Sequence, residues 1–178
     1  MTKKLYPFLS GLHFALLQFG YLLLLQMNFS STYLTYMIIS LAWITGTLIG
    51  LWWKNLNPII ALTAGISSYC LIFALIVSNP FSPLILPLSS LGVAITGLWA
   101  GRFFIVMLPA FKDVDQLFFL ENNGFILGII AIFLGFTLLG IGFILWAPLG
   151  SAAILLLRFK LVDVEQQAVT ASLVGEQK

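Results

Sequence analysis

The sequence predicts an all-α, polytopic integral membrane protein with six transmembrane helices, and three observations carry this prediction. Of the 178 residues, 61% are hydrophobic and only 8% are charged, whereas soluble domains average about 25% charged residues. The hydrophobic residues form six runs close to the ~20 residues that cross ~30 Å of hydrocarbon. The connections between these runs alternate between basic and neutral, as they do in membrane proteins whose basic loops stay in the cytoplasm.

The apolar runs lack the alternation of polar and apolar residues that marks the strands of a β-barrel. The first run follows two lysines, is too long for the core of a signal peptide and has no cleavage site after it, so we expect an uncleaved first helix. The fourth run is long, which predicts a tilted or kinked helix. The expected spans are about Tyr6–Met27, Tyr33–Trp53, Pro58–Val77, Ser82–Pro109, Leu117–Leu138 and Ile141–Leu157.

Gly140 and Gly142 are the expected turn between the last two runs, which are otherwise nearly continuous. The spans make up one expected transmembrane domain at residues 1–160. A short polar tail follows at residues 161–178 and is expected in the cytoplasm.

The basic residues fix an orientation for these spans. Three connections on the opposite side, at residues 27–32, at 78–83 and around Gly140, contain no charged residue. Basic residues stand instead before the first span and in every second connection, at Lys3, Lys4, Lys54, Lys112, Arg158 and Lys160. The positive-inside rule therefore predicts that both termini are cytoplasmic, in the inner (cytoplasmic) membrane of the cell.

Two residue counts exclude several classes of site. The chain has a single cysteine, Cys70, and a single histidine, His13, so it has neither an internal disulfide nor the paired ligands of zinc and bis-histidine haem sites. We expect no metal and no cofactor. The basic residues are too few and too scattered for nucleic acid to be a partner. Cys70 is interpreted as a small buried hydrophobe, and His13 as either a packing residue or a titrating one.

Three pairs of glycines are spaced four residues apart inside the predicted spans. Glycine at this spacing lets helix backbones approach closely, and close packing matters in lipid because no hydrophobic force draws helices together there. The sequence leaves open whether these pairs pack helices within one chain, form the seam of a homodimer, or allow sliding in a transporter. The pairs are Gly46 and Gly50, Gly97 and Gly101, and Gly124 and Gly128.

The fifth run contains the polar stretch LFFLENNGFILGII, with Glu121, Asn122 and Asn123 in its first turns. Arg102 of the fourth run is expected at a similar depth on a neighbouring helix. A lone charge inside a membrane is costly and usually pairs. We therefore predict an Arg102–Glu121 ion pair, with Asn122 or Asn123 adding hydrogen bonds. The alternative is that Arg102 extends to the headgroups and Glu121 lies at the membrane interface.

Two stretches, TYLTYMIISLAWITGTLIGLWWKN at 32–55 and LENNGFILGIIAIFLGFTLLG at 120–140, resemble the membrane domain of some bacterial spermidine-synthase-like proteins. That domain is similar to one six-helix half of a major-facilitator transporter. The resemblance implies a major-facilitator-half-like bundle over about residues 30–160. Its span-five motif, an acidic residue before a pair of glycines, falls on Glu121, Gly124 and Gly128.

The sequence departs from this family in three respects. Glutamate stands at position 121 instead of the usual aspartate, and Asn122 stands instead of a small hydroxyl residue. The soluble synthase part does not follow Lys160, so the resemblance does not imply aminopropyl transfer. It implies a stand-alone, half-transporter-like membrane unit.

The function favoured by the sequence is that of a non-catalytic accessory or scaffolding subunit of a membrane assembly, working with copies of itself or with other membrane subunits. The alternative is a small transporter or transporter subunit, with Pro87, Pro109 and Pro148 interrupting its helices and a small or apolar substrate. An enzyme is not expected, because no motif places a nucleophile, an acid and a base together.

Overall fold

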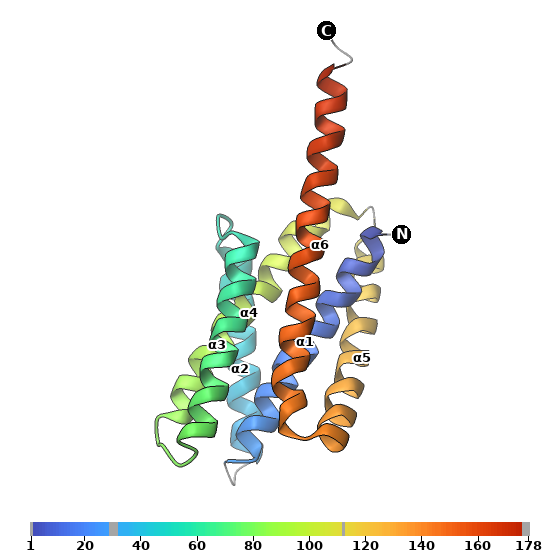
Figure 1. Ribbon diagram of the computed structural model, residues 1–178. Helices are drawn as coiled ribbons and strands as arrows, with labels where there is room; N and C mark the ends of the chain where they lie inside the picture. Colours follow the sequence, from blue (N-terminus) through green and yellow to red (C-terminus); the bar gives the residue numbers. More distant parts are fainter. Residues whose placement is uncertain (1, 29–31, 112, 176–178) are drawn as a thin grey trace.

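The computed structural model describes residues 2–28, 32–111 and 113–175, and these residues form a bundle of helices with no strand among them (Figure 1). A short 3₁₀ turn, Leu108–Ala110, follows the fourth helix. The helices are α1 (Thr2–Gln26), α2 (Thr32–Trp52), α3 (Pro58–Ser78), α4 (Ile85–Met107), α5 (Val114–Leu139) and α6 (Ile141–Gly175).

All six helices are long and apolar enough to cross a membrane, so the all-α class and the six predicted spans are confirmed at that level. Four boundaries differ from the expected ones by three residues or more. Helix α1 begins four residues before the expected Tyr6, α4 begins three residues after the expected Ser82, and α5 begins three residues before the expected Leu117. Helix α6 continues to Gly175, so that it extends beyond the rest of the bundle (Figure 1). The apolar part of α6 is Ile141–Arg158.

Local residues explain three helix ends, namely the start of α3 and both ends of α5. Asn57 precedes α3, and its side chain accepts hydrogen bonds from the N–H groups of Ile59 and Ile60 at 2.8 and 3.4 Å, which satisfies donors that a helix start leaves free. Asp113 caps α5 through the N–H of Asp115 at 3.1 Å. Gly140 ends α5 with φ +69°, a conformation that residues with a side chain rarely adopt.

Helix α1 lies at the centre of the bundle. In its most apolar window 72% of the residues are buried, against 28% in α2 and in α5. Its most extensive contacts are with α5, followed by α6, and those of α4 are with α2, followed by α3. When the first three helices are exchanged with the last three, the two main contacts of α1 correspond to the two main contacts of α4. The beginning of α1 lies at the end of the bundle where α6 continues outward (Figure 1).

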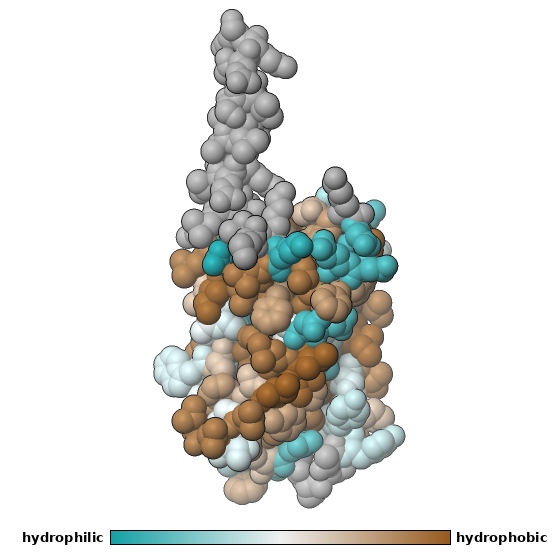
Figure 2. Space-filling model, turned by 90° about the vertical axis from the view of Figure 1, so that its right-hand side faces the viewer, coloured by the Kyte–Doolittle hydropathy of each residue, from teal (hydrophilic) through white to brown (hydrophobic). Residues whose placement is uncertain are grey.

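Large apolar side chains cover much of the outside of the bundle. Figure 2 shows the side that carries α5 as mostly brown, with teal areas toward its upper end. Leu138 is 78% exposed, and Leu41, Leu71 and Trp146 are also strongly exposed. Such a surface is unfavourable in water and favourable in lipid.

Candidate functional site

Helices α2 and α4 pack through glycines on both sides. A Cβ atom added at any of the four would meet the backbone of the opposite helix, so only glycine allows this approach. The contacts are reciprocal: Gly46 faces the carbonyl of Ala94, Gly50 that of Leu98, Gly97 that of Trp43 and Gly101 that of Thr47.

Helices α1 and α5 form a second close contact, in which Gly124 faces the carbonyl of Phe8 and Gly128 that of Leu12. On the α1 side, Gly11 faces the carbonyl of Glu121. All six glycines that the sequence singled out therefore lie at contacts within the chain. The sequence analysis did not identify Gly11 as a packing residue, because no glycine stands four residues away from it. The feature that could have indicated the contact is the small size of Gly11 among the bulky residues of α1.

The structure does not bring Arg102 and Glu121 into the expected ion pair. Both side chains are buried, at 7% and 8% exposure. The Nε and Nη1 atoms of Arg102 have no hydrogen-bond partner among the described residues, and no ion pair with Glu121 is formed. The burial of Arg102 leaves little of its side chain free to extend to the headgroups, and the depth of Glu121 relative to the membrane interface stays a prediction.

The direction in which the side chains leave their helices explains why the pair does not form. Phe104 of α4 stacks on Phe118 of α5 with 5.1 Å between ring centroids, so Phe104 marks the side of α4 that faces α5. Arg102 comes two residues earlier and therefore points about 200° around the helix from Phe104, away from α5. Arg102 and Glu121 therefore point to different sides of the bundle.

The two asparagines do not support Glu121. Asn122 donates to the carbonyl of Phe118 at 2.9 Å, and Asn123 donates to that of Phe119 at 2.6 Å. Each amide thus satisfies one donor within its own helix, and both side chains are exposed on α5. The expected hydrogen bonds to an ion pair are replaced by these local ones.

His13 is buried and is held by α6. Its Nδ1 lies 2.7 Å from the Oγ of Ser151, whose hydroxyl donates to the carbonyl of Pro148 at 2.9 Å. With Nδ1 protonated, His13 donates to Oγ while the serine hydroxyl donates to the carbonyl of Pro148, so both hydrogen bonds can form at once. The Nε2 atom has no hydrogen-bond partner in the described part of the chain.

A hydrogen bond also joins α3 to α6, next to Pro148. Pro148 has no N–H, so the carbonyl of Ile144, four residues earlier, lacks its usual helical partner. The hydroxyl of Tyr69 donates to this carbonyl at 2.7 Å. The Tyr69 ring packs edge-on against Tyr21, with centroids 4.8 Å apart. A side chain from α3 therefore replaces the hydrogen bond that the proline removes. The sequence signal was a proline inside one span and a tyrosine inside another, but their pairing is not visible in the sequence.

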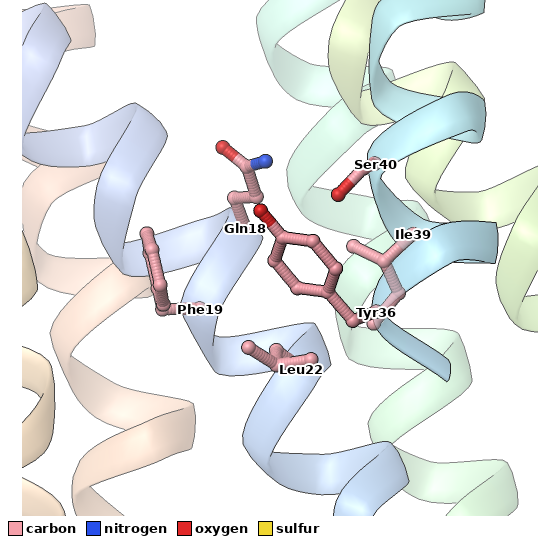
Figure 3. A pocket seen from close by; sticks show the side chains of 6 residues that line it. All are labelled: Gln18, Phe19, Leu22, Tyr36, Ile39 and Ser40. Carbon is pink, nitrogen blue, oxygen red and sulfur yellow. The ribbon is translucent and has the colours of Figure 1, made fainter. Parts of the chain in front are cut away.

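One face of the bundle carries polar groups on two neighbouring spans, α1 and α2. Gln18 of α1 and Tyr36 and Ser40 of α2 gather around a small recess of about 10 Å³, and Figure 3 shows their polar ends on the same side of it. None of the three side chains hydrogen-bonds to another described residue. The apolar lining of the recess is Phe19, Leu22 and Ile39.

This face extends onto α5, because Phe19 packs edge-on against Phe125 and Phe133 of that helix, with centroids 6.1 and 5.7 Å apart. We call it the α1–α2–α5 face and define it by Gln18, Phe19, Tyr36, Ser40 and Phe133. In the part of the chain that the structure describes, no group of three or more metal-ligating side chains comes together.

No known protein family matches the chain, and no curated protein or solved structure shows significant similarity to it.

Proposed function

We propose that the chain is a multi-pass protein of the inner (cytoplasmic) membrane with both termini in the cytoplasm. Two observations support this. The outside of the bundle is covered by exposed apolar side chains, and the basic residues stand on one side of the spans only. Trp52 and Trp53 are exposed next to Lys54 at the end of α2, an arrangement that suits the membrane–water interface.

The proposed role is that of a non-catalytic accessory or scaffolding subunit, which presents the α1–α2–α5 face to another membrane protein. The observation that carries this role is the set Gln18, Tyr36 and Ser40, which has no partner among the described residues; Gln18 and Ser40 lie two turns inside their spans, and Tyr36 lies one turn inside. Lipid tails offer no hydrogen bonds, and each unsatisfied polar group in hydrocarbon is costly. A protein partner can satisfy these groups, so this face is better suited to a protein contact than to lipid.

The packing inside the bundle supports a scaffolding role. At α2–α4 and at α1–α5 the helix backbones touch directly through glycine, and α3 and α6 are tied by the Tyr69 hydrogen bond. Helices held this closely have little room to slide. The bundle is therefore suited to holding a fixed shape to which other chains bind.

The repeated contact pattern supports the major-facilitator-half-like architecture that the resemblance implies. In that architecture two three-helix repeats of opposite orientation are related by a pseudo-two-fold axis in the membrane plane. Exchanging α1–α3 with α4–α6 turns the α1·α5 contact into α4·α2 and the α1·α6 contact into α4·α3, and these are extensive contacts here. A unit of this kind, related to spermidine-synthase-like membrane domains, remains our proposal for the family.

A photocrosslinking residue at position 40 tests the proposed role in living cells. We expect adducts with a polypeptide from position 40. A matched control is position 71 on α3, where Leu71 is 69% exposed near the middle of its span, and this position should give adducts with lipid only. If position 40 also gives lipid adducts only, the scaffolding proposal is wrong.

The orientation has its own test with reporter fusions. Fusions after residues 30, 80 and 140 should report the outer side, and those after residues 55, 113 and 165 should report the cytoplasm. A cytoplasmic signal from the connection at 78–83 would overturn this topology.

Transport of a small or apolar substrate is a second candidate function, and one observation favours it. Arg102 and Glu121 are both buried with no partner among the residues that the structure describes, an expensive arrangement that often marks ion or proton pathways in membranes. Purified protein in liposomes that contain a pH-sensitive dye tests this candidate. Proton flux that is lost in Glu121→Gln would favour transport over scaffolding.

A further inference from the structure

We propose that a second copy of this chain binds the α1–α2–α5 face, so that the polar groups of the two copies satisfy one another. The two copies are related by a two-fold axis perpendicular to the membrane. This inference rests on the proposed function, because it takes this face as an assembly surface, and it adds the identity of the partner.

The chemistry of the face is self-complementary. A two-fold interface uses the same patch on both subunits, so every group must be able to bind its own kind or a neighbour in that patch. The amide of Gln18 both donates and accepts, and so do the hydroxyls of Tyr36 and Ser40. Charged groups of one sign would repel their copies, but none of the residues lining the recess is charged.

The depth of the polar groups also favours a second copy. Gln18 lies two turns inside the span Lys4–Gln26, and Ser40 lies two turns inside Tyr33–Trp52. A two-fold axis perpendicular to the membrane leaves depth unchanged, so it brings these groups of one copy to those of the other. The recess has room for about one water molecule, and its polar side chains have no partner within the described part of the chain.

Aromatic side chains border these groups and supply apolar contact area. Tyr36 is 57% exposed, and Phe133 on α5 is 41% exposed. Large aromatic residues are enriched in protein interfaces, and here they stand on either side of α1. A contact between two such faces surrounds the polar centre with apolar side chains and keeps it away from lipid.

Cysteine crosslinking in native membranes tests the proposal. In a Cys70→Ala background, Ser40→Cys should give a crosslinked homodimer with a short bismaleimide, because the two copies of position 40 face each other. Leu71→Cys in the same background is the control and should stay monomeric. Two differently tagged copies, expressed together, identify the dimer by the presence of both tags in one band.

The outcomes separate this inference from the proposed function. A crosslinked band that contains only one tag and a different polypeptide overturns the homodimer and leaves the scaffolding role standing. A monomer from Ser40→Cys, with lipid adducts from the photocrosslinker at the same position, overturns both. Equal dimer yields from Ser40→Cys and Leu71→Cys mean random collision and overturn the homodimer.

Removing one polar group measures its contribution without relying on crosslinking. Gln18→Leu keeps a side chain of similar size and should weaken dimerisation in detergent by about three- to tenfold, in line with the modest strength of hydrogen bonds between membrane helices. The control Leu71→Ala should leave the dissociation constant unchanged. Dimerisation that is unchanged or tighter in Gln18→Leu would mean that this face is not the interface.

Discussion

The two closest helix contacts in the bundle are built differently. At α2–α4, glycines on both helices face carbonyls of the other helix, and those carbonyls belong to uncharged residues. At α1–α5, the glycine pair is on α5 alone, and α1 offers the single Gly11, which faces the carbonyl of a buried glutamate. The first contact is therefore reciprocal between two glycine pairs, whereas the second is one-sided and brings the backbone of a buried carboxylate residue against α1.

The difference shows what a glycine pair specifies in a membrane helix. The spacing marks a surface where a backbone can approach closely, which is the same at both contacts. It does not specify which helix approaches, or whether that helix has matching glycines. The partner of α5 is the central helix α1, which contains no glycine pair at this spacing.

The largest expected effect comes from filling these contacts. Gly46→Leu and Gly124→Leu should each lower the free energy of unfolding by about 3 kcal/mol, because the added side chain meets rigid backbone. The measurement is unfolding of the purified protein in mild detergent. The control is Gly150→Leu, since a Cβ at Gly150 has no atom within 4 Å and leucine favours the helix. If Gly124→Leu matched the control while Gly46→Leu did not, the two contacts would not be equivalent.

The α3–α6 contact differs from the two glycine contacts, because it is stabilised by a side-chain hydrogen bond and not by close approach of the helix backbones. Tyr69→Phe should cost about 1–3 kcal/mol, since the carbonyl of Ile144 is then buried without a partner. Pro148→Ala restores the missing N–H, so Tyr69→Phe in that background should cost less than about 0.5 kcal/mol. An equal cost in both backgrounds would show that the hydroxyl does not replace the bond lost at the proline.

A double-mutant cycle examines the charge that distinguishes the α1–α5 contact. The structure predicts that Arg102→Met and Glu121→Gln are additive within about 0.5 kcal/mol, because the two side chains point to different sides of the bundle. Glu121→Gln alone should not lower stability, as it removes an unpaired buried charge. A coupling energy of about 1 kcal/mol or more would show that the two groups meet, as the sequence suggested.

The smallest expected effect is at the asparagines beside Glu121. Asn123→Leu should change stability by less than about 0.5 kcal/mol, because its amide bonds only to its own helix and its side chain is exposed. Asn122→Leu should behave in the same way. A loss of more than about 1 kcal/mol in either variant would indicate a partner on another chain, which native gel mobility can then identify.

Much of the fold was determined by the sequence alone. The six spans and the turn at Gly140 follow from local properties, namely runs of apolar residues and a glycine between the last two runs. Gly142, the other glycine expected in this turn, lies inside α6. The glycine pairs could be identified because their spacing places both residues on the same side of a helix. These features depend on neighbouring residues in the chain, so no knowledge of the packing is needed to find them.

The tertiary structure decided which side chains meet. The sequence put Arg102 and Glu121 at matching depth, but rotation about the α4 axis, fixed by Phe104 against Phe118, turns Arg102 away. The sequence also could not show that Tyr69 hydrogen-bonds to the carbonyl of Ile144, which lies 75 residues further along the chain and lacks a helical donor because of Pro148. Nor could it show that Gln18 lies beside Tyr36 and Ser40. Depth in the membrane follows from position along a span, whereas the direction of a side chain depends on how each helix is rotated against its neighbours, and that is set only when the whole bundle packs.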